Sequence, residues 1–148
     1  MGLFSRKPAP EAAPPVAPAP PDDPLGRILG LAVDAAAYAD GTLTLTFVGG
    51  AGEAHLEAFG KLKVIHSGES LDPTRRGFDA AVSSLVGRKV GAASQKRGEE
   101  LAIEFEGGVA VVASLKGGDY PGTSAVYLKG PGKSYVNFHR DGFTRLAL

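Results

Sequence analysis

Apolar and polar residues alternate along most of the chain after residue 24, which is the pattern of β-strands with one buried face. In residues 43–47, leucine and phenylalanine occupy every second position and threonine the positions between. The Asp40-Gly41 pair before this segment is a tight-turn signal, so we expect residues 31–38 to form its hairpin partner. Further strands are predicted at residues 53–58 and 61–66 around a turn at Phe59-Gly60, and at residues 109–115, 123–128, 134–138 and 143–148.

Two segments recur later in the chain. Residues 26–30, Gly-Arg-Ile-Leu-Gly, are echoed by residues 87–91, Gly-Arg-Lys-Val-Gly, 61 positions downstream. Residues 43–50, an alternating run that ends in Gly-Gly, are echoed by residues 101–108, 58 positions downstream. The difference predicts a hairpin that is three residues shorter in the second copy. We interpret the echoes as a duplicated β-meander, with copies in residues 25–71 and 85–138.

One helix is predicted between the two copies, over residues 73–86. Asp72 is suited to cap this helix, Pro73 to occupy its first position, and Gly87 to end it. Three apolar residues fall on one side of it: Phe78, Val82 and Leu85. Because each meander also has one apolar face, we expect the helix to pack across a twisted, mostly antiparallel sheet. The predicted fold class is α+β, mostly β: a duplicated antiparallel β-meander with one packing helix.

The first 24 residues differ in composition from the rest. Eight of the eleven prolines fall there and alternate largely with alanine, so backbone donors are missing and no periodic apolar face exists. We predict a disordered Pro/Ala-rich arm over residues 1–24, followed by a single β-rich domain over residues 25–148. The tip of the arm is a candidate hook for a partner or a membrane surface, because two apolar residues lie beside two basic ones there: Leu3, Phe4, Arg6 and Lys7.

Composition excludes several classes of function. The 148 residues include sixteen basic and sixteen acidic ones, whereas a general nucleic-acid binder needs an excess of Lys and Arg. The absence of cysteine excludes disulfides, thiol catalysis and Cys-ligated metal centres. No apolar run approaches the roughly 18 to 20 residues of a transmembrane helix, and no secretory signal follows the first basic residues. We therefore expect a cytoplasmic protein.

Motifs for catalysis and ligand binding are incomplete in this sequence. Gly130-Pro131-Gly132-Lys133-Ser134 ends like a phosphate-binding loop, but Tyr127 stands where the first glycine belongs and a β-type pattern follows instead of a helix. A Pro-Gly hairpin turn explains the same residues. His139-Arg140-Asp141 can pair locally, but no Gly-x-Ser-x-Gly turn supplies a nucleophile. The three histidines lack the spacing of a metal site: His55, His66 and His139. We predict no catalytic, cofactor-binding or metal-binding residues.

Charged residues suggest two candidate surfaces. Glu104 and Glu106 are expected on the outward face of a strand, and their alignment with Glu53 and Glu57 would make an acidic patch for a basic partner. A candidate anion-facing side is formed by six basic residues around the helix ends and the following strand: Arg75, Arg76, Arg88, Lys89, Lys96 and Arg97.

The order of these features carries a resemblance. Its components are Leu71-Asp72-Pro73 before the helix, Leu85-Val86-Gly87-Arg88 after it, a second Leu-x-Ile-x-Phe-x-Gly-Gly hairpin, and a late strand near Val126-Tyr127 before a Gly-Pro-Gly turn. Over residues 25–138 the chain resembles an uncharacterised family of small bacterial immunity-like domains. The chain lacks that family's Tyr-Glu-Ala-Trp segment between Tyr120 and Val126. The resemblance implies a non-enzymatic protein that acts by binding another protein.

Three functional hypotheses follow. The first is a non-enzymatic protein-binding module, immunity-like in action, whose outward sheet face or strand edge meets the partner while the arm serves as a tether. The alternative is a scaffold or assembly component that docks through the tip of the arm. The third, an enzyme or small-molecule binder, needs a concave pocket with converging titratable groups. The sequence leaves open the oligomeric state, the partner's identity, and whether the sheet is open or closed.

Overall fold

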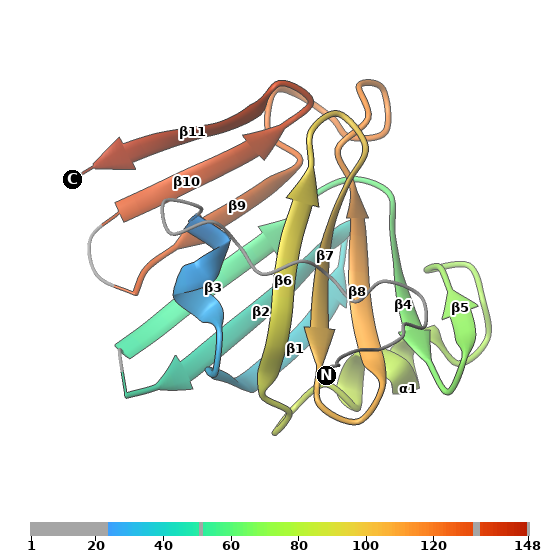
Figure 1. Cartoon of the computed structure of the whole chain (residues 1–148). Helices are drawn as coiled ribbons and strands as arrows, with labels where there is room; N and C mark the ends of the chain where they lie inside the picture. Colours follow the sequence, from blue (N-terminus) through green and yellow to red (C-terminus); the bar gives the residue numbers. More distant parts are fainter. Residues whose placement is uncertain (1–23, 51, 132–133, 148) are drawn as a thin grey trace, which may run out of the picture.

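The computed structural model describes residues 24–50, 52–131 and 134–147. Its strands form two antiparallel sheets that face each other (Figure 1). Sheet A contains, in spatial order, β1 (Ala32–Ala39), β2 (Thr42–Gly49), β3 (Gly52–Ala58), β9 (Val126–Lys129), β10 (Ser134–His139) and β11 (Gly142–Ala147). Sheet B contains β5 (Glu69–Leu71), β4 (Leu62–His66), β8 (Val109–Ser114), β7 (Glu100–Phe105) and β6 (Val90–Lys96). A 3-10 helix, η1 (Pro24–Ile28), precedes β1, and the helix α1 (Phe78–Ser83) precedes β6.

The predicted class, α+β and mostly β with one short α-helix, is confirmed for the described residues. The first hairpin illustrates why the local pattern was informative. β1 pairs with β2 across Asp40 and Gly41, whose φ angles are 53° and 80°. Positive φ at both central residues is what the type I′ hairpin turn requires, and Asp-Gly adopts it readily.

Each half of the chain divides its strands between the sheets in the same way. β1, β2 and β3 build sheet A before β4 and β5 cross to sheet B, while β6, β7 and β8 build sheet B before β9 and β10 cross to sheet A. Consequently β3 pairs with β9, and β8 pairs with β4. The sequence suggested that residues 53–58 and 61–66 are neighbours around a turn. The structure corrects this, because β3 and β4 lie in different sheets.

The two halves meet where the beginnings of β1 and β6 cross. The Gly30 amide donates to the Val90 carbonyl at 2.9 Å, and the Gly87 amide donates to the Val33 carbonyl at 2.8 Å. The two bonds are counterparts of each other, because Gly87 lies 57 positions after Gly30 and Val90 lies 57 positions after Val33. The same holds for a second pair, both 2.9 Å: Val33 amide to Arg88 carbonyl, and Val90 amide to Leu31 carbonyl.

At this crossing the two halves are related by 57 positions, which corrects the spacing of 61 predicted from residues 26–30. The predicted echo does not match in structure, because residues 24–28 form η1 whereas residue 90 begins β6. The second echo aligns as predicted: Phe47 pairs with Val33, and Phe105 pairs with Val90. These partners are 14 residues apart in the first hairpin and 15 in the second, so the second hairpin is not shortened. A bulge follows both valines. That the halves arose by duplication stays a prediction.

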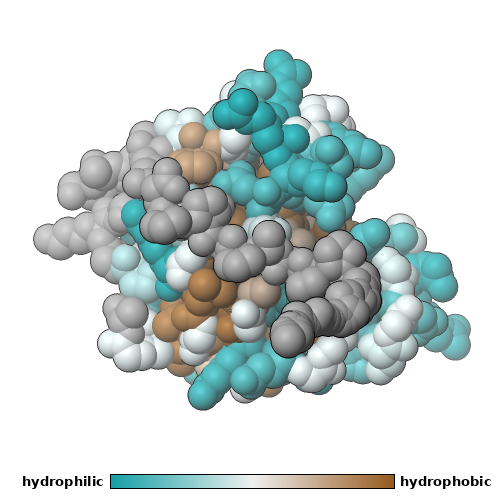
Figure 2. All heavy atoms as spheres, viewed as in Figure 1, coloured by the Kyte–Doolittle hydropathy of each residue, from teal (hydrophilic) through white to brown (hydrophobic). Residues whose placement is uncertain are grey.

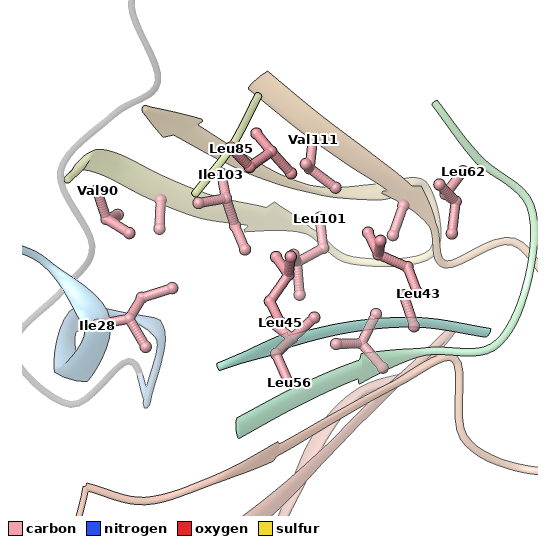
Figure 3. Packing of buried hydrophobic residues seen from close by; sticks show 14 of the residues in the cluster. Ile28, Leu43, Leu45, Leu56, Leu62, Leu85, Val90, Leu101, Ile103 and Val111 are labelled. Atoms are coloured by element: carbon pink, nitrogen blue, oxygen red, sulfur yellow. The ribbon is translucent and has the colours of Figure 1, made fainter. Parts of the chain in front are cut away.

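Buried apolar side chains fill the space between the two sheets (Figure 3). Burial of one such leucine or isoleucine stabilises the fold by roughly 1.5–3 kcal/mol. The core is therefore made by one sheet covering the other, which corrects the expected packing of a helix across a single sheet. α1 packs instead against β1 and β4 and adds its buried side chains Phe78, Ala81 and Val82 to this core. Side chains that face each other across the core, each at most 1% exposed, are Leu43, Leu45 and Leu56 against Leu101, Ile103 and Val111.

α1 is shorter than the predicted helix over residues 73–86. Gly77 has a φ of 96°, in the left-handed region, so the right-handed helix begins only after it. Asp72 accepts a hydrogen bond from the Thr74 amide at 2.8 Å and thus stabilises a turn before the helix. The predicted apolar stripe is confirmed, because Phe78, Val82 and Leu85 are all buried.

The N-terminal boundary of the fold lies at η1. Pro24, which the sequence places in the arm, is the buried first residue of this 3-10 helix, and Leu25 and Ile28 are fully buried. The rest of the predicted arm lies outside the described residues. Among the helices of the described part of the chain, none is long and apolar enough to span a bilayer.

Candidate functional site

The outer surface of sheet A carries an aromatic and polar cluster. Tyr127 on β9 and Tyr135 on β10 stack, with ring centroids 5.4 Å apart. The Lys129 ammonium lies 5.3 Å from the Tyr135 ring centroid. The strand register explains this grouping, since it places Tyr127 opposite Asn137 and Lys129 opposite Tyr135. We call these four residues the tyrosine cluster.

Strands β1, β2 and β3 extend this surface with mostly short side chains. His55 on β3 is held from two sides: its Nε2 lies 3.3 Å from the Glu53 carboxylate and its Nδ1 lies 3.3 Å from the Thr46 hydroxyl. The register continues the tyrosine cluster across the sheet, because β3 pairs with both β9 and β2. The tyrosine face is the cluster together with Ala35, Ala37, Thr44, Thr46, His55 and Glu57.

The Tyr127 phenol sits in a partly desolvated position on this face. Burial raises the pKa of Tyr127, and the neighbouring Tyr135 and Glu57 raise it further against the opposing effect of Lys129. Like an ordinary tyrosine, the phenol keeps its proton at neutral pH, and it presents a hydrogen-bond donor beside the stacked rings.

A hollow of about 490 Å³ adjoins the tyrosine face. It lies between the loop of residues 117–123 and the β10–β11 turn, at the end of the molecule where the β6–β7, β8–β9 and β10–β11 connections lie (Figure 1). Figure 2 shows hydrophilic residues gathered at this end. Asn137 belongs to both the tyrosine face and the hollow, and Thr144 is its partner on β11. The polar side chains that line the hollow are Tyr120, Thr123, Asn137, His139, Arg140, Asp141 and Thr144.

His139 accepts one hydrogen bond and donates another to Thr144, whose own hydroxyl hydrogen is left for a further acceptor. The Asp141 amide donates to His139 Nδ1 at 3.2 Å, so the proton of the neutral ring is on Nε2. Nε2 lies 3.1 Å from the Thr144 hydroxyl oxygen and donates to it. The Thr144 hydroxyl keeps its own proton for another acceptor.

Tyr120 and Asn137 also accept hydrogen bonds from other residues of the protein. The Arg140 amide donates to the Tyr120 hydroxyl at 3.0 Å, and the Ser124 hydroxyl lies 3.2 Å from Asn137 Oδ1. The Tyr120 hydroxyl proton and the Asn137 amide hydrogens remain as donors. Arg140 adds a guanidinium whose Nε lies 3.9 Å from the Asp141 carboxylate, with both side chains mostly exposed. The hollow therefore offers mainly hydrogen-bond donors.

Asp119 fixes the wall of the hollow. Its carbonyl accepts from the Lys61 amide at 2.9 Å, and its carboxylate accepts from the Ser114 hydroxyl at 2.6 Å and lies 3.6 Å from the Lys61 ammonium. The bond from Ser114 is the main reason why the pKa of Asp119 lies below its ordinary value, and Lys61 adds to the effect. Gly60 permits the close approach, because a Cβ there would lie 2.5 Å from the Asp119 carbonyl oxygen and 2.6 Å from the Tyr120 Cβ.

Two arginines lie against glycines next to the hollow. A Cβ on Gly117 would be 3.1 Å from Arg140 Cδ and Nη1, and a Cβ on Gly142 would be 3.5 Å from Arg97 Nε and Nη2. Arg97 follows β6, so the β6–β7 turn of sheet B meets the β10–β11 turn of sheet A here. These glycines let the guanidinium groups lie close to the backbone.

The structure separates the three histidines of the sequence. His55 lies on the tyrosine face, His139 lines the hollow, and His66 ends β4, with its Nδ1 3.2 Å from the Ser67 hydroxyl. Within the described ranges, no group of three or more His, Asp or Glu side chains could hold a metal ion. The predicted local pairing of Arg140 with Asp141 is confirmed.

Neither predicted charged surface forms. Glu53 and Glu57 lie on β3 in sheet A, whereas Glu104 lies on β7 in sheet B, so these acids do not align across one sheet. Lys89 precedes β6 and Lys96 ends it, which separates them by roughly 20 Å along an extended strand. The six basic residues are therefore spread along the length of β6 and the segment before α1 and do not gather in one cluster.

The segment after Tyr127 joins β9 and β10 as an antiparallel hairpin, as predicted. A strand stands where a phosphate-binding loop needs a helix, and residues 132 and 133 of the motif lie outside the described residues. The tyrosine cluster was missed. Its signal was present in this hairpin, because Tyr127 and Lys129 on one strand and Tyr135 and Asn137 on the next share a face by alternation.

No protein-family model, curated protein or solved structure matches this chain. The resemblance to small bacterial immunity-like domains therefore stays a prediction.

Proposed function

We propose that this chain is a non-enzymatic, cytoplasmic protein-binding module and that the tyrosine face meets the partner. Immunity-like action, which the sequence resemblance implies, is the finer form of this proposal. The observation that carries it is the stack of Tyr127 and Tyr135, with Lys129 beside it, on the outer surface of a six-stranded sheet. Tyrosine gives a large contact area at a small loss of side-chain entropy and is enriched among the residues that dominate binding energy.

The residues around the stack favour the same surface. Thr44 and Thr46 are β-branched and stiff, so their ordering at an interface requires little entropy. Ala35 and Ala37 are short and exposed, which lets a partner approach the backbone of β1. His55 is already paired with Glu53, so this group needs no new partner on binding. The fitting partner is a protein that presents an apolar or aromatic group to the stack and a hydrogen-bond acceptor to Lys129.

The outer surface of sheet B is less suited to this role. The row at the centre of that surface runs from Lys63 through Val112 and Ala102 to Ser94 and carries no aromatic side chain. Aromatic residues are enriched in protein interfaces, so this row offers fewer anchoring contacts. Sheet B therefore supplies the matched control surface.

The test compares two double variants of the full chain. Y127A/Y135A removes the stack, and K63A/S94A changes the outer surface of sheet B. A partner is first identified by capture from the source cells, then purified, and its affinity for each variant is measured by isothermal titration calorimetry. We expect Y127A/Y135A to bind about thirtyfold or more weakly, since one dominant interface residue contributes about 2 kcal/mol. K63A/S94A should bind like the wild type.

Circular dichroism melting curves establish that each variant is folded before its affinity is interpreted. A folded Y127A/Y135A variant with wild-type affinity contradicts the proposal. A third variant, L3S/F4S, tests docking through the tip of the arm. We expect it to retain the partner, and loss of the partner by this variant alone would assign binding to the arm.

A further inference from the structure

We propose that the hollow beside the tyrosine face binds an acidic side chain of the partner. This inference rests on the proposed function and adds the chemistry by which the partner is recognised. It depends on the hydrogen-bond inventory, the charge and the position of the hollow.

The inventory favours an acceptor. The acceptors of His139, Tyr120 and Asn137 already receive hydrogen bonds from within the protein. Hydrogens remain on Tyr120 Oη, Asn137 Nδ2 and Thr144 Oγ1, which all line the hollow. A carboxylate has only acceptors to offer and can take several such hydrogens at once.

The charge favours an anion. The Arg140 guanidinium lines the hollow, and the Arg97 guanidinium lies against Gly142 in the adjoining turn. The lining includes one carboxylate, that of Asp141, which is 79% exposed and 3.9 Å from Arg140 Nε. This separation is longer than a charge-assisted hydrogen bond, so Arg140 can still form a two-pronged contact with an incoming carboxylate.

The position favours a side chain of a bound partner. Asn137 shares the hollow and the tyrosine face, and the register continues from Thr144 through Asn137 and Tyr127 to Glu57 across the sheet. A partner segment that lies along this row can direct one side chain into the hollow. Asp119 already fixes the wall, which keeps the ordering required on binding small.

The experiment titrates the ¹⁵N-labelled full chain with three small probes. N-acetyl-glutamic acid amide carries a side-chain carboxylate, N-acetyl-glutamine amide is its neutral analogue, and N-acetyl-alanine carries only a terminal carboxylate. We expect the glutamic acid probe to shift the amide signals of Gly117, Gly118, Tyr120 and Arg140 in a saturable way. The glutamine probe should not shift them. Equal or tighter binding of N-acetyl-alanine would overturn the assignment to a side chain.

Variants locate the response. R140Q should weaken the glutamic acid probe about fivefold, the effect of about 1 kcal/mol at an exposed ion pair, and T144V should weaken it further when combined with R140Q. R76Q, which removes an exposed arginine before α1, is the matched control and should leave the affinity unchanged. Equal affinity of folded R140Q and wild type overturns the inference.

The two proposals fail separately. If no carboxylate probe shifts the signals of the hollow while Y127A/Y135A still loses the purified partner, this inference is wrong and the proposed function stands. If the glutamic acid probe binds in the hollow while Y127A/Y135A keeps the partner, the assignment of the interface to the tyrosine face is wrong.

Discussion

Asp119 connects three parts of the molecule through one residue. Its carbonyl and carboxylate bind the amide and ammonium of Lys61, and its carboxylate also accepts from Ser114 at the end of β8. The loop that forms the wall of the hollow is thereby joined to both sheet B and the β3–β4 connection. A substitution at Asp119 should therefore change the free energy of unfolding and the dependence of this free energy on pH.

We expect D119N to lower the free energy of unfolding at pH 7. The pKa of Asp119 is lower in the folded state, so its stabilising effect is complete above the unfolded pKa of about 3.9 and is lost as pH falls through the folded pKa. The difference between wild type and D119N should therefore shrink below about pH 4. Urea denaturation at pH 7 and pH 3 measures it. D141N, a change at an exposed and loosely paired carboxylate, is the control.

Gly60, like Asp119, is a residue on which the wall of the hollow depends. In G60A the new Cβ would lie 2.5 Å from the Asp119 carbonyl oxygen, a backbone atom that cannot move by a rotamer change. We expect a loss of about 1–3 kcal/mol in unfolding free energy, together with altered amide signals in residues 117–123. G50A is the control, because no atom lies within 4 Å of its Cβ position. Equal stability of G60A and G50A would refute the argument.

At the scale of elements, local signals specified hairpins well and element ends less well. The Asp-Gly turn and the alternation in β2 and β7 predicted these strands because both signals act within a few residues. The helix was predicted too long because Asp72 and Pro73 are also compatible with a turn, and Gly77 decides between them through its φ of 96°.

The left-handed conformation of Gly77 predicts a mutational effect opposite to the one expected from helix propensity. Alanine favours helix over glycine, yet G77A should destabilise the protein by about 1 kcal/mol, because an L residue is strained at this left-handed position. S83A, at an exposed position inside α1, should be neutral or slightly stabilising. Chemical denaturation of both variants provides the comparison. A stabilised G77A would mean that the helix extends toward Asp72 in solution.

At the scale of the whole molecule, the pairings that close the sheets join distant segments. β3 pairs with β9 and β4 pairs with β8, and no local pattern of residues identifies such partners. The alternation in β9 and β10 could have placed the tyrosines on one face. The hollow could not be predicted, because it needs the loop of residues 117–123 to meet the turn at Arg140, which depends on the tertiary fold.

Cutting the chain between the exposed residues Arg75 and Arg76 should test how the halves depend on each other. We expect neither fragment to show a cooperative melting transition, since each lacks the partner strands for its β4 or β9. Mixed in equal amounts, the fragments should form a one-to-one complex with the β-type circular dichroism spectrum of the intact chain. A fragment that melts cooperatively when alone would contradict this expectation.

The exchange of strands between the sheets gives this single chain the connectivity of an intertwined homodimer. A polypeptide with only one unit would have to lend its last two strands to a second molecule, so fusion of two such genes would preserve the architecture while releasing one copy from symmetry. The two halves differ in the connection between β8 and β9, which is far longer than that between β3 and β4, and in β11, which has no equivalent in the first half. Both differences border the hollow, so the site proposed for recognition lies where the two halves of the chain are least alike.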